Sequence, residues 1–277
     1  MKNKFLKVVL LATLMILLVA CGKKTQNNSG ETNKEKVVIG GTALSQVYYE
    51  PLAEKYKEMG YKTEFKMFDS NQIPLEALQN GDIDISIAQH KKYVKSFNKN
   101  NNADLDLVKP YGMYTGIGLY SEKYSKIEDI PENGSIAIMN DAMNENIALR
   151  ILEKSGLIKI DKNAKLATVA DIVENKKNLK IKEIEQAQLV SSLSDVDAAC
   201  IFFTHMSNAK KDPSKYLARD DEMINYPMGP FVKKENVNAK WAVDFAKCYR
   251  DKDVQGKIKQ LFPGVFEFYT DDSQVSE

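Results

Sequence analysis

The sequence predicts an α/β fold with parallel-rich sheets, and two observations support this class. Residues 37–111 alternate between strand-like and helix-like runs, and a second strand–helix series begins at residue 135. Such alternation is typical of parallel strands joined by covering helices. A chain of 277 residues with 43% hydrophobic residues can build one large domain or two ordinary ones.

The first series predicts four strands and three helices. Strands are expected at 37–41, 63–68, 83–87 and 105–111, where apolar residues are continuous or alternate. Apolar residues at helical spacing predict helices at 44–59, 73–78 and 91–97. Gly60 and Gly81 are expected to end the first two helices. A polar loop is expected at 98–102.

The second series follows a glycine-punctuated, aromatic stretch at 111–120. This stretch either carries the chain into a second lobe or forms a twisted strand. Later strands are expected at 135–139, 179–184 and 198–203, with helices at 142–152 and 189–193 and a helical or turn piece at 169–175. Asn140-Asp141 is expected to cap the helix at 142, because short polar side chains accept from its first amides. A return connection at 225–232 precedes helices at 239–249 and 254–262.

The start of the chain has the pattern of a bacterial lipoprotein signal peptide. A basic start and an apolar run end in Leu18-Val19-Ala20-Cys21, which resembles a lipobox. That resemblance implies cleavage after residue 20 and a lipid on the thiol of Cys21; the alternative is an ordinary signal peptide with a chance cysteine. Residues 21–35 are polar and predict a flexible tether. Removing residues 1–20, with three lysines and no acid, changes the net charge from +1 to −2.

Composition and motifs argue against several functions. The net charge of +1 gives no indication of nucleic-acid binding. No nucleophile elbow, metal-ligand helix, phosphate-binding glycine loop or catalytic-cysteine context is present, so an enzyme is not expected. Cys200 and Cys248 lie in apolar contexts and are expected to be small buried hydrophobes. Their spacing does not demand a disulfide, and the pairing stays open.

The stretch from Gly81 to Tyr93 is the centre of the functional hypothesis. A short strand with Ile83, Ile85 and Ile87 runs directly into Gln89-His90. Open α/β sheets bind ligands at the carboxyl ends of their strands. The stretch is therefore either the edge of a ligand site or a core strand that happens to end in a histidine.

Several motifs in one order resemble the NlpA type of methionine-binding lipoprotein, the substrate-binding component of an ABC importer. They are Phe68-Asp69-Ser70 with Pro74 and Glu76-Ala77-Leu78, Gly81-Asp82-Ile83-Asp84, Gln89-His90-Lys91 with Tyr93, Lys126-Ile127-Glu128-Asp129-Ile130, Asn140-Asp141, Gly156-Leu157-Ile158, Asp171-Ile172-Val173-Glu174-Asn175 and Asn178-Leu179-Lys180-Ile181. The resemblance covers about residues 36–265. It implies a type II periplasmic-binding-protein fold with two lobes, 36–113 plus 232–277 and 114–231, joined by two crossover segments near 113–118 and 228–232.

The resemblance also implies the function and the partners. The protein would hold a small amino-acid-like or more apolar molecule between its lobes and deliver it, as a monomer, to an ABC permease with its ATPase. It would be anchored to the cell membrane through Cys21 on the extracytoplasmic side. No cofactor, metal or nucleic acid is expected. A surface lipoprotein that keeps the fold as a sensor or host-contact protein is the alternative.

The expected ligand-binding residues come from both lobes. They are Phe68, His90, Tyr93, Tyr114, Asn140, Asp141, Asn144, Phe202, Thr204, His205 and Met228. His90 and His205 follow predicted strands, one in each lobe. They are either a shared ligand contact, or a metal site with Asp141, or one pocket histidine and one unrelated surface histidine.

Several positions depart from the family pattern. Where relatives that bind methionine have a carboxylate-gripping arginine, this chain has Ile147, and Arg150 lies three residues further on. Phe202 or Phe203 replaces one asparagine, Gly229 replaces another, and Ala88 stands where phenylalanine is common. Burying a zwitterion without these groups costs several kcal/mol or more. We therefore predict that free methionine is not the main ligand and that the pocket is more apolar, with Arg150 as a possible substitute if it reaches inward.

Overall fold

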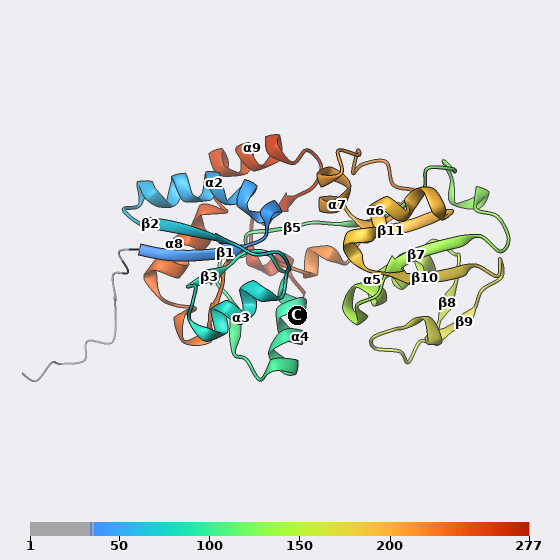
Figure 1. Ribbon diagram of the computed structural model, residues 1–277, viewed down its shortest axis with the longest axis horizontal. Helices are drawn as coiled ribbons and strands as arrows, with labels where there is room; N and C mark the ends of the chain where they lie inside the picture. The colour runs from blue at the N-terminus through green and yellow to red at the C-terminus, as the bar shows by residue number, and fades with distance from the viewer. Residues whose placement is uncertain (1–33, 35, 277) are drawn as a thin grey trace, which may run out of the picture. The chain divides into compact units, whose positions relative to one another are not determined.

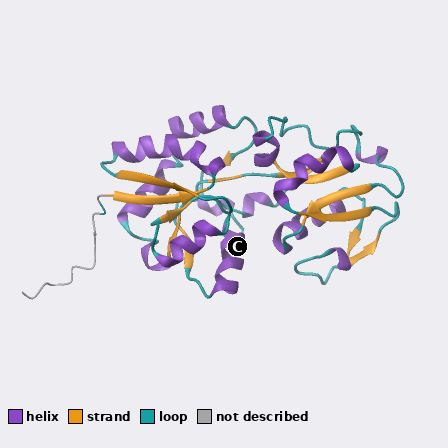
Figure 2. Ribbon diagram, in the orientation of Figure 1, coloured by secondary structure: helices purple, strands orange, loops and turns teal. Residues whose placement is uncertain are grey.

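The structure is a computed structural model that describes residue 34 and residues 36–276, and it confirms the predicted α/β class. The described strands form two five-stranded sheets with helices around them, together with two short two-stranded sheets (Figures 1 and 2). The predicted signal peptide, Cys21 and the tether, apart from Lys34, lie outside the described residues. Within the described part, none of the helices has the length and apolar character needed to span a bilayer.

The first sheet has the strand order β2-β1-β3-β13-β4. Its strands are β1 Lys36–Gly41, β2 Lys62–Met67, β3 Ile85–Ser86, β4 Leu105–Leu107 and β13 Phe231–Lys233. β1 is parallel to β2 and β3, but β13 is antiparallel to β3 and β4. The four strands of the first series therefore run in one direction, as expected, but β13, which returns from much later in the chain, lies antiparallel between β3 and β4.

Five helices accompany this sheet. They are α2 Ala43–Glu58, α3 Ile73–Asn80, α4 Lys91–Asn101, α8 Lys240–Cys248 and α9 Lys252–Leu261. In Figure 1, α2 and α9 lie above the strands, and α3 and α4 lie below them. The polar loop expected at 98–102 is wrong, since α4 continues to Asn101 and ends at the left-handed Asn102. Buried Phe97 anchors the last turns, and the Asn98 side chain donates to Leu105 O at 2.8 Å.

The second sheet has the order β10-β7-β11-β6-β12. Its strands are β6 Ile117–Tyr120, β7 Ser135–Met139, β10 Lys180–Ile184, β11 Ala198–Phe202 and β12 Ala218–Arg219, and its helices are α5 Ala142–Lys154, α6 Leu189–Ser192 and α7 Phe203–Asn208. β10, β7 and β11 are parallel, whereas β6 is antiparallel to β11 and β12. The helical or turn piece expected at 169–175 is only half right. Its second part is β9 Ile172–Glu174, which pairs with β8 Lys159–Ile160.

Two connections run between the sheets. The glycine-punctuated stretch contains β5 Met113–Tyr114 and then β6, so it leads from the first sheet into the second. Residues 220–230 lead back to β13. Short 3₁₀ helices complete the described elements: η1 Ile127–Asp129, η2 Val169–Asp171, η3 Gln186–Gln188, η4 Leu193–Asp195, η5 Met223–Asn225, η6 Lys234–Asn236 and η7 Asp272–Gln274.

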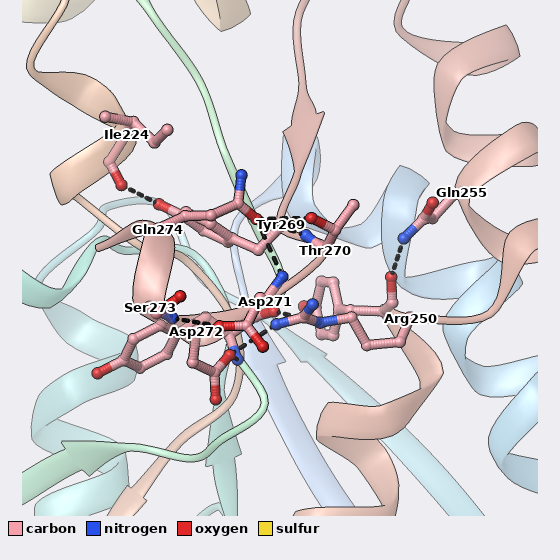
Figure 3. A network of polar contacts seen from close by, with 11 residues as sticks. Ile224, Arg250, Gln255, Tyr269, Thr270, Asp271, Asp272, Ser273 and Gln274 are labelled. Atoms are coloured by element: carbon pink, nitrogen blue, oxygen red, sulfur yellow. Dashed lines mark hydrogen bonds and ion pairs between the residues drawn. The ribbon is translucent and has the colours of Figure 1, made fainter.

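The C-terminal segment, residues 265–276, contacts both connections. Its strand β14 Glu267–Phe268 pairs with β5. Asp272 Oδ1 accepts from Arg250 Nη2 at 2.6 Å (Figure 3). It also accepts from Tyr111 N at 2.8 Å. Tyr269 OH donates to Ile224 O in the second connection (Figure 3).

Both described cysteines are free and buried. Burial raises the pKa of Cys200, in β11, and raises that of Cys248, in α8, to about 12. The pairing that the sequence left open is therefore absent, and each thiol acts as the small hydrophobe expected of it.

Candidate functional site

His90 is held at the junction between β3 and α4. It is the N-cap of α4, and its Nδ1 accepts a hydrogen bond from Tyr93 N at 3.1 Å. The preceding Gln89 is fixed on both sides, because its Oε1 accepts from Ser86 Oγ at 2.8 Å and its Nε2 donates to Asn71 O at 2.5 Å. Since Nδ1 is an acceptor, the ring proton of neutral His90 sits on Nε2.

Aromatic rings surround His90, which is 8% exposed. The ring of Tyr226 lies 5.2 Å away and that of Tyr93 lies 6.2 Å away, both edge-on. Burial lowers the pKa of His90 to about 4, while a hydrogen-bonding contribution from the Asn144 side chain opposes this shift. His90 is therefore neutral near pH 7 and can donate from Nε2.

The first turn of α5 provides the facing group. Asp141 caps this helix, and its Oδ1 accepts from Asn144 N at 3.1 Å. Its Oδ2 accepts from Asn144 Nδ2 at 2.9 Å. Asn144 is 4% exposed, and its Oδ1 has no hydrogen-bond partner among the described residues. Because Nδ2 is bonded to Asp141, Oδ1 is the atom through which the Asn144 side chain acts on His90, whose Nε2–H can donate to it.

The second connection lies against His90. Met228 pairs with both His90 and Met113 through its backbone, and Lys91 N donates to Pro227 O at 2.9 Å. Met228 is 6% exposed. The structure therefore brings five of the expected residues into one neighbourhood: His90, Tyr93, Asp141, Asn144 and Met228.

Other expected residues lie elsewhere. His205, on α7, contacts Gln186 through its Nε2 at 2.8 Å and the ring of Phe202 at 6.2 Å. No contact joins His205 to His90 in the described part of the chain, and no group of His, Cys, Asp and Glu residues there is suited to hold a metal ion. Tyr114 OH donates to Glu267 at 2.7 Å. The contacts given for His205 and Tyr114 are therefore with residues other than His90.

The remaining expected residues have weaker links to His90. Phe68 is half-buried, and its N donates to Gly41 O at 2.8 Å. Asn140 is exposed, and its N donates to Ile184 O at 3.1 Å. Thr204 is half-buried in α7, beside the buried Phe202.

The position of the missing arginine is apolar in the structure as well. Ile147 is 1% exposed in α5. Arg150 donates to Glu153 Oε2 at 2.9 Å and to Ala164 O at 2.8 Å. Its guanidinium is thus committed to partners in its own neighbourhood. Ile147 and Arg150 line a cavity of about 190 Å³ together with Arg219 and Asp220, and His90 is not part of this cavity.

Sequence reasoning missed two neighbours of His90. Tyr226 was part of an expected connection, yet its ring covers the histidine. Lys92 Nζ lies 3.8 Å from the centre of the Tyr226 ring. Lys92 lies on the expected helix at 91–97, but Tyr226 comes from a distant connection, so only the tertiary structure reveals their contact beside His90.

The two mixed sheets with two connections define the class of the protein: it has the type II fold of periplasmic binding proteins. The family model for NlpA lipoprotein matches residues 37–266, so the chain belongs to this family. A similar protein from Vibrio cholerae, a probable D-methionine-binding lipoprotein MetQ, is 30% identical over 269 residues, which is 94% of this chain and 96% of that protein.

Two solved structures of binding proteins are also similar to this chain. The substrate-binding protein of a methionine transporter from Streptococcus pneumoniae is 33% identical, with a TM-score of 0.76 over 84% of this chain and 95% of that one. A nutrient-binding protein from Burkholderia cenocepacia, bound to methionine, is 32% identical, with a TM-score of 0.75 over 84% of this chain and 99% of that one. The relatives are thus binding proteins and lipoproteins by name.

Proposed function

We propose that this chain is the lipid-anchored, extracytoplasmic solute-binding protein of an ABC importer. Lobes 36–113 plus 232–277 and 114–231 would close on a small molecule by hinge motion. One observation carries the proposal: His90, from the first sheet, faces Asn144, from the helix after β7 of the second sheet. Relatives that bind methionine or serve its transporter support the transport role.

The mechanism needs no chemistry on the ligand. Ligand binds the closed state better than the open state, because only closure brings His90 and Tyr93 to the α5 residues Asp141 and Asn144. The closed form then docks on the permease, whose ATPase drives transport. The lipid on Cys21 would keep the binding protein close to the permease.

We propose further that free methionine is not the main ligand. The first turns of α5 carry no basic residue from Asn140 to Leu149, and Ile147 is buried. A ligand carboxylate placed beside Asn144 would meet no α5 cation, since Arg150 is already bonded to Glu153 and Ala164. An unpaired buried carboxylate costs several kcal/mol, which removes most of the affinity expected of a binding protein.

The test is to isolate the full chain from membranes and identify its small molecules by mass spectrometry, with the lipid on Cys21 read from the same sample. Calorimetry with L-methionine follows. We expect a copurified small solute and no submicromolar methionine binding. Submicromolar binding would contradict the ligand prediction only. A chain that neither copurifies with a solute nor binds one would overturn the transport proposal in favour of a sensor or host-contact lipoprotein.

A further inference from the structure

The first connection is held from residue 111 to residue 115 by the C-terminal segment, residues 265–276. The backbone N–H of residue 111 donates to Asp272 Oδ1 at 2.8 Å, and the carbonyl of residue 112 accepts from Tyr269 N at 3.4 Å. β14 pairs with residues 113 and 114 in β5. Thr115 Oγ1 donates to Val265 O at 3.0 Å. Because each residue of this stretch is bonded to the C-terminal segment, the stretch resists bending.

The first connection changes partners after Thr115. Gly116 O accepts from Phe203 N at 2.9 Å, and Ile117 N donates to Asp220 Oδ2 at 2.8 Å. Phe203 follows β11 and Asp220 follows β12, so both partners belong to the second-sheet side. A Cβ at Gly116 would lie 2.4 Å from the Phe203 ring, so the backbone fits closely against that side. The link from Thr115 to Gly116 is therefore the place where this connection can bend.

The second connection also divides between two successive residues. Met223 N donates to Asp220 Oδ1 at 2.6 Å, and the same carboxylate holds Ile117, so Met223 is bonded to the second-sheet side. The carbonyl of the next residue, Ile224, accepts from Tyr269 OH (Figure 3). The Ile224 side chain packs against an apolar cluster of the first sheet and its helices α3 and α4, and Tyr269 is a member of this cluster. Ile224 is therefore bonded to the first-sheet side.

Residues 225–228 continue on the first-sheet side. Ser276 N, in the C-terminal segment, donates to Asn225 Oδ1 at 2.8 Å. Met228 pairs through its backbone with the first connection and with His90 at the start of α4. The ring of Tyr226 lies edge-on to that of His90 at 5.2 Å. The residues that cover His90 are therefore attached to the same body that carries His90.

The junction between residues 223 and 224 is bridged by weak interactions. It lies inside η5, and two backbone hydrogen bonds of 2.8 and 3.0 Å cross it within this single 3₁₀ turn. A 3₁₀ turn has poorer hydrogen-bond geometry than an α-helix and often marks a hinge. Arg219 of β12 and Glu267 of β14 also meet across the junction, but at 3.4 Å and with side chains that are 36% and 55% exposed. Such an exposed ion pair adds little resistance to bending.

We propose that the C-terminal segment on one side and Asp220 on the other set the hinge of this protein at two links, one between residues 115 and 116 and one between residues 223 and 224. Residues 224–231 then move with the first sheet. This inference rests on the proposed solute-binding function, and it moves the boundaries of the proposed lobes to 36–115 plus 224–277 and 116–223.

This hinge divides the ligand site unequally. His90, Tyr226 and Met228 form one preassembled half, which keeps its shape in the open and the closed state. Closure adds only Asp141 and Asn144 from the other lobe. A solute therefore binds first to the half around His90, and the C-terminal segment acts through Ile224 as a positioning element that does not touch the solute.

The experiment follows one residue on each side of the second junction. Spin labels on Glu222→Cys and on Asn225→Cys are each paired with a label on Lys95→Cys in α4 or on Lys182→Cys in β10, both exposed positions, in the full chain. The native thiols in the described part are buried, and the proposed lipid blocks Cys21. Asn225→Cys removes the bond to the C-terminal segment at that residue but leaves the bond at residue 224. Pulsed dipolar spectroscopy measures the four distance distributions without solute.

We expect narrow distributions for the pairs 95–225 and 182–222 and wide ones for 95–222 and 182–225. Tyr269→Phe keeps the ring but removes its bond to Ile224, so the 95–225 pair should lose its narrow distribution while the 182–222 pair retains it. Tyr49→Phe is the matched control, because it removes a buried tyrosine's bond to Thr63 in the first sheet, and it should change none of the four. Thermal midpoints of both variants report whether they fold.

Two results would overturn the inference and leave the solute-binding function intact. One is a narrow distribution for 182–225 with a wide one for 95–225, because the chain would then bend beyond residue 225. The other is a folded Tyr269→Phe protein with four unchanged distributions, which would show that the C-terminal segment does not set the hinge. Four narrow distributions in the unsubstituted background would overturn hinge closure together with this inference. The solute-binding function is decided separately, by whether a solute copurifies with the chain.

Discussion

At the scale of single residues, His90 has a structural role, and we propose that it also binds the ligand. Its Nδ1 caps α4 by accepting from Tyr93 N at 3.1 Å, which leaves Nε2–H as the group that can meet a ligand. Burial keeps the ring neutral by lowering its pKa to about 4. Protonation would place a charge among buried rings, so His90 is neutral in the folded protein.

The pH dependence of stability follows from this shift. Unfolded histidine takes up a proton near pH 6.5, whereas folded His90 resists it until about pH 4. The unfolded state therefore binds more protons between these values, and stability falls as the pH falls. We expect a loss of about 2 kcal/mol between pH 7 and pH 5 that His90→Asn does not show. Urea unfolding of the wild-type and His90→Asn proteins at pH 7 and pH 5 measures the free energy of unfolding in each case. An equal loss of that free energy in both proteins would contradict the prediction.

At the scale of elements, the turn that positions β3 depends on one glycine. Gly81 ends α3 with a φ of +87°, and its N donates to Ala77 O at 3.0 Å and to Leu78 O at 3.2 Å. Only glycine adopts this left-handed conformation without strain. The turn leads into the strand that delivers His90, so local backbone chemistry determines where the site begins.

Replacing Gly81 by alanine is expected to destabilise the protein by about 1 kcal/mol, because a Cβ is strained at this φ although it would contact only Lys233 Nζ at 3.5 Å. Gly256→Ala is the matched control. It lies inside α9, where an added Cβ meets nothing within 4 Å, and should stabilise by roughly 0.5–1 kcal/mol. Chemical unfolding of both variants checks the opposite signs. A stabilised Gly81→Ala protein would show that the turn tolerates another conformation.

At the scale of the whole molecule, the C-terminal segment joins distant parts of the chain. Asp272 accepts from Arg250 (Figure 3) and from Tyr111 N, and Arg250 Nε donates to Tyr111 O at 2.9 Å. Glu267 contacts Arg219 at 3.4 Å and Tyr114 at 2.7 Å. The segment thus contacts both connections between the sheets, which are the stretches that a hinge would bend.

The Asp272→Ala substitution is expected to cost roughly 1–3 kcal/mol, because it removes the acceptor of the buried Tyr111 N and of Nη2 of the partly buried Arg250. Glu54→Ala breaks an ion pair with Lys257 whose two side chains are 66% and 55% exposed, and should change stability by less than about 0.5 kcal/mol. Thermal and urea unfolding of both variants gives the comparison. Equal small effects would mean that the C-terminal segment adds little to the fold.

The sequence by itself determined the α/β class, most helices and strands, and the family, because apolar periodicity and turn residues are local properties. Short motifs also predicted His90, Asp141 and Asn144 as ligand-binding residues, which stays a prediction. Only the tertiary structure inserted β13 between β3 and β4 and covered His90 with Tyr226. These features join residues more than 100 positions apart, and no local pattern encodes which distant segments will pack together.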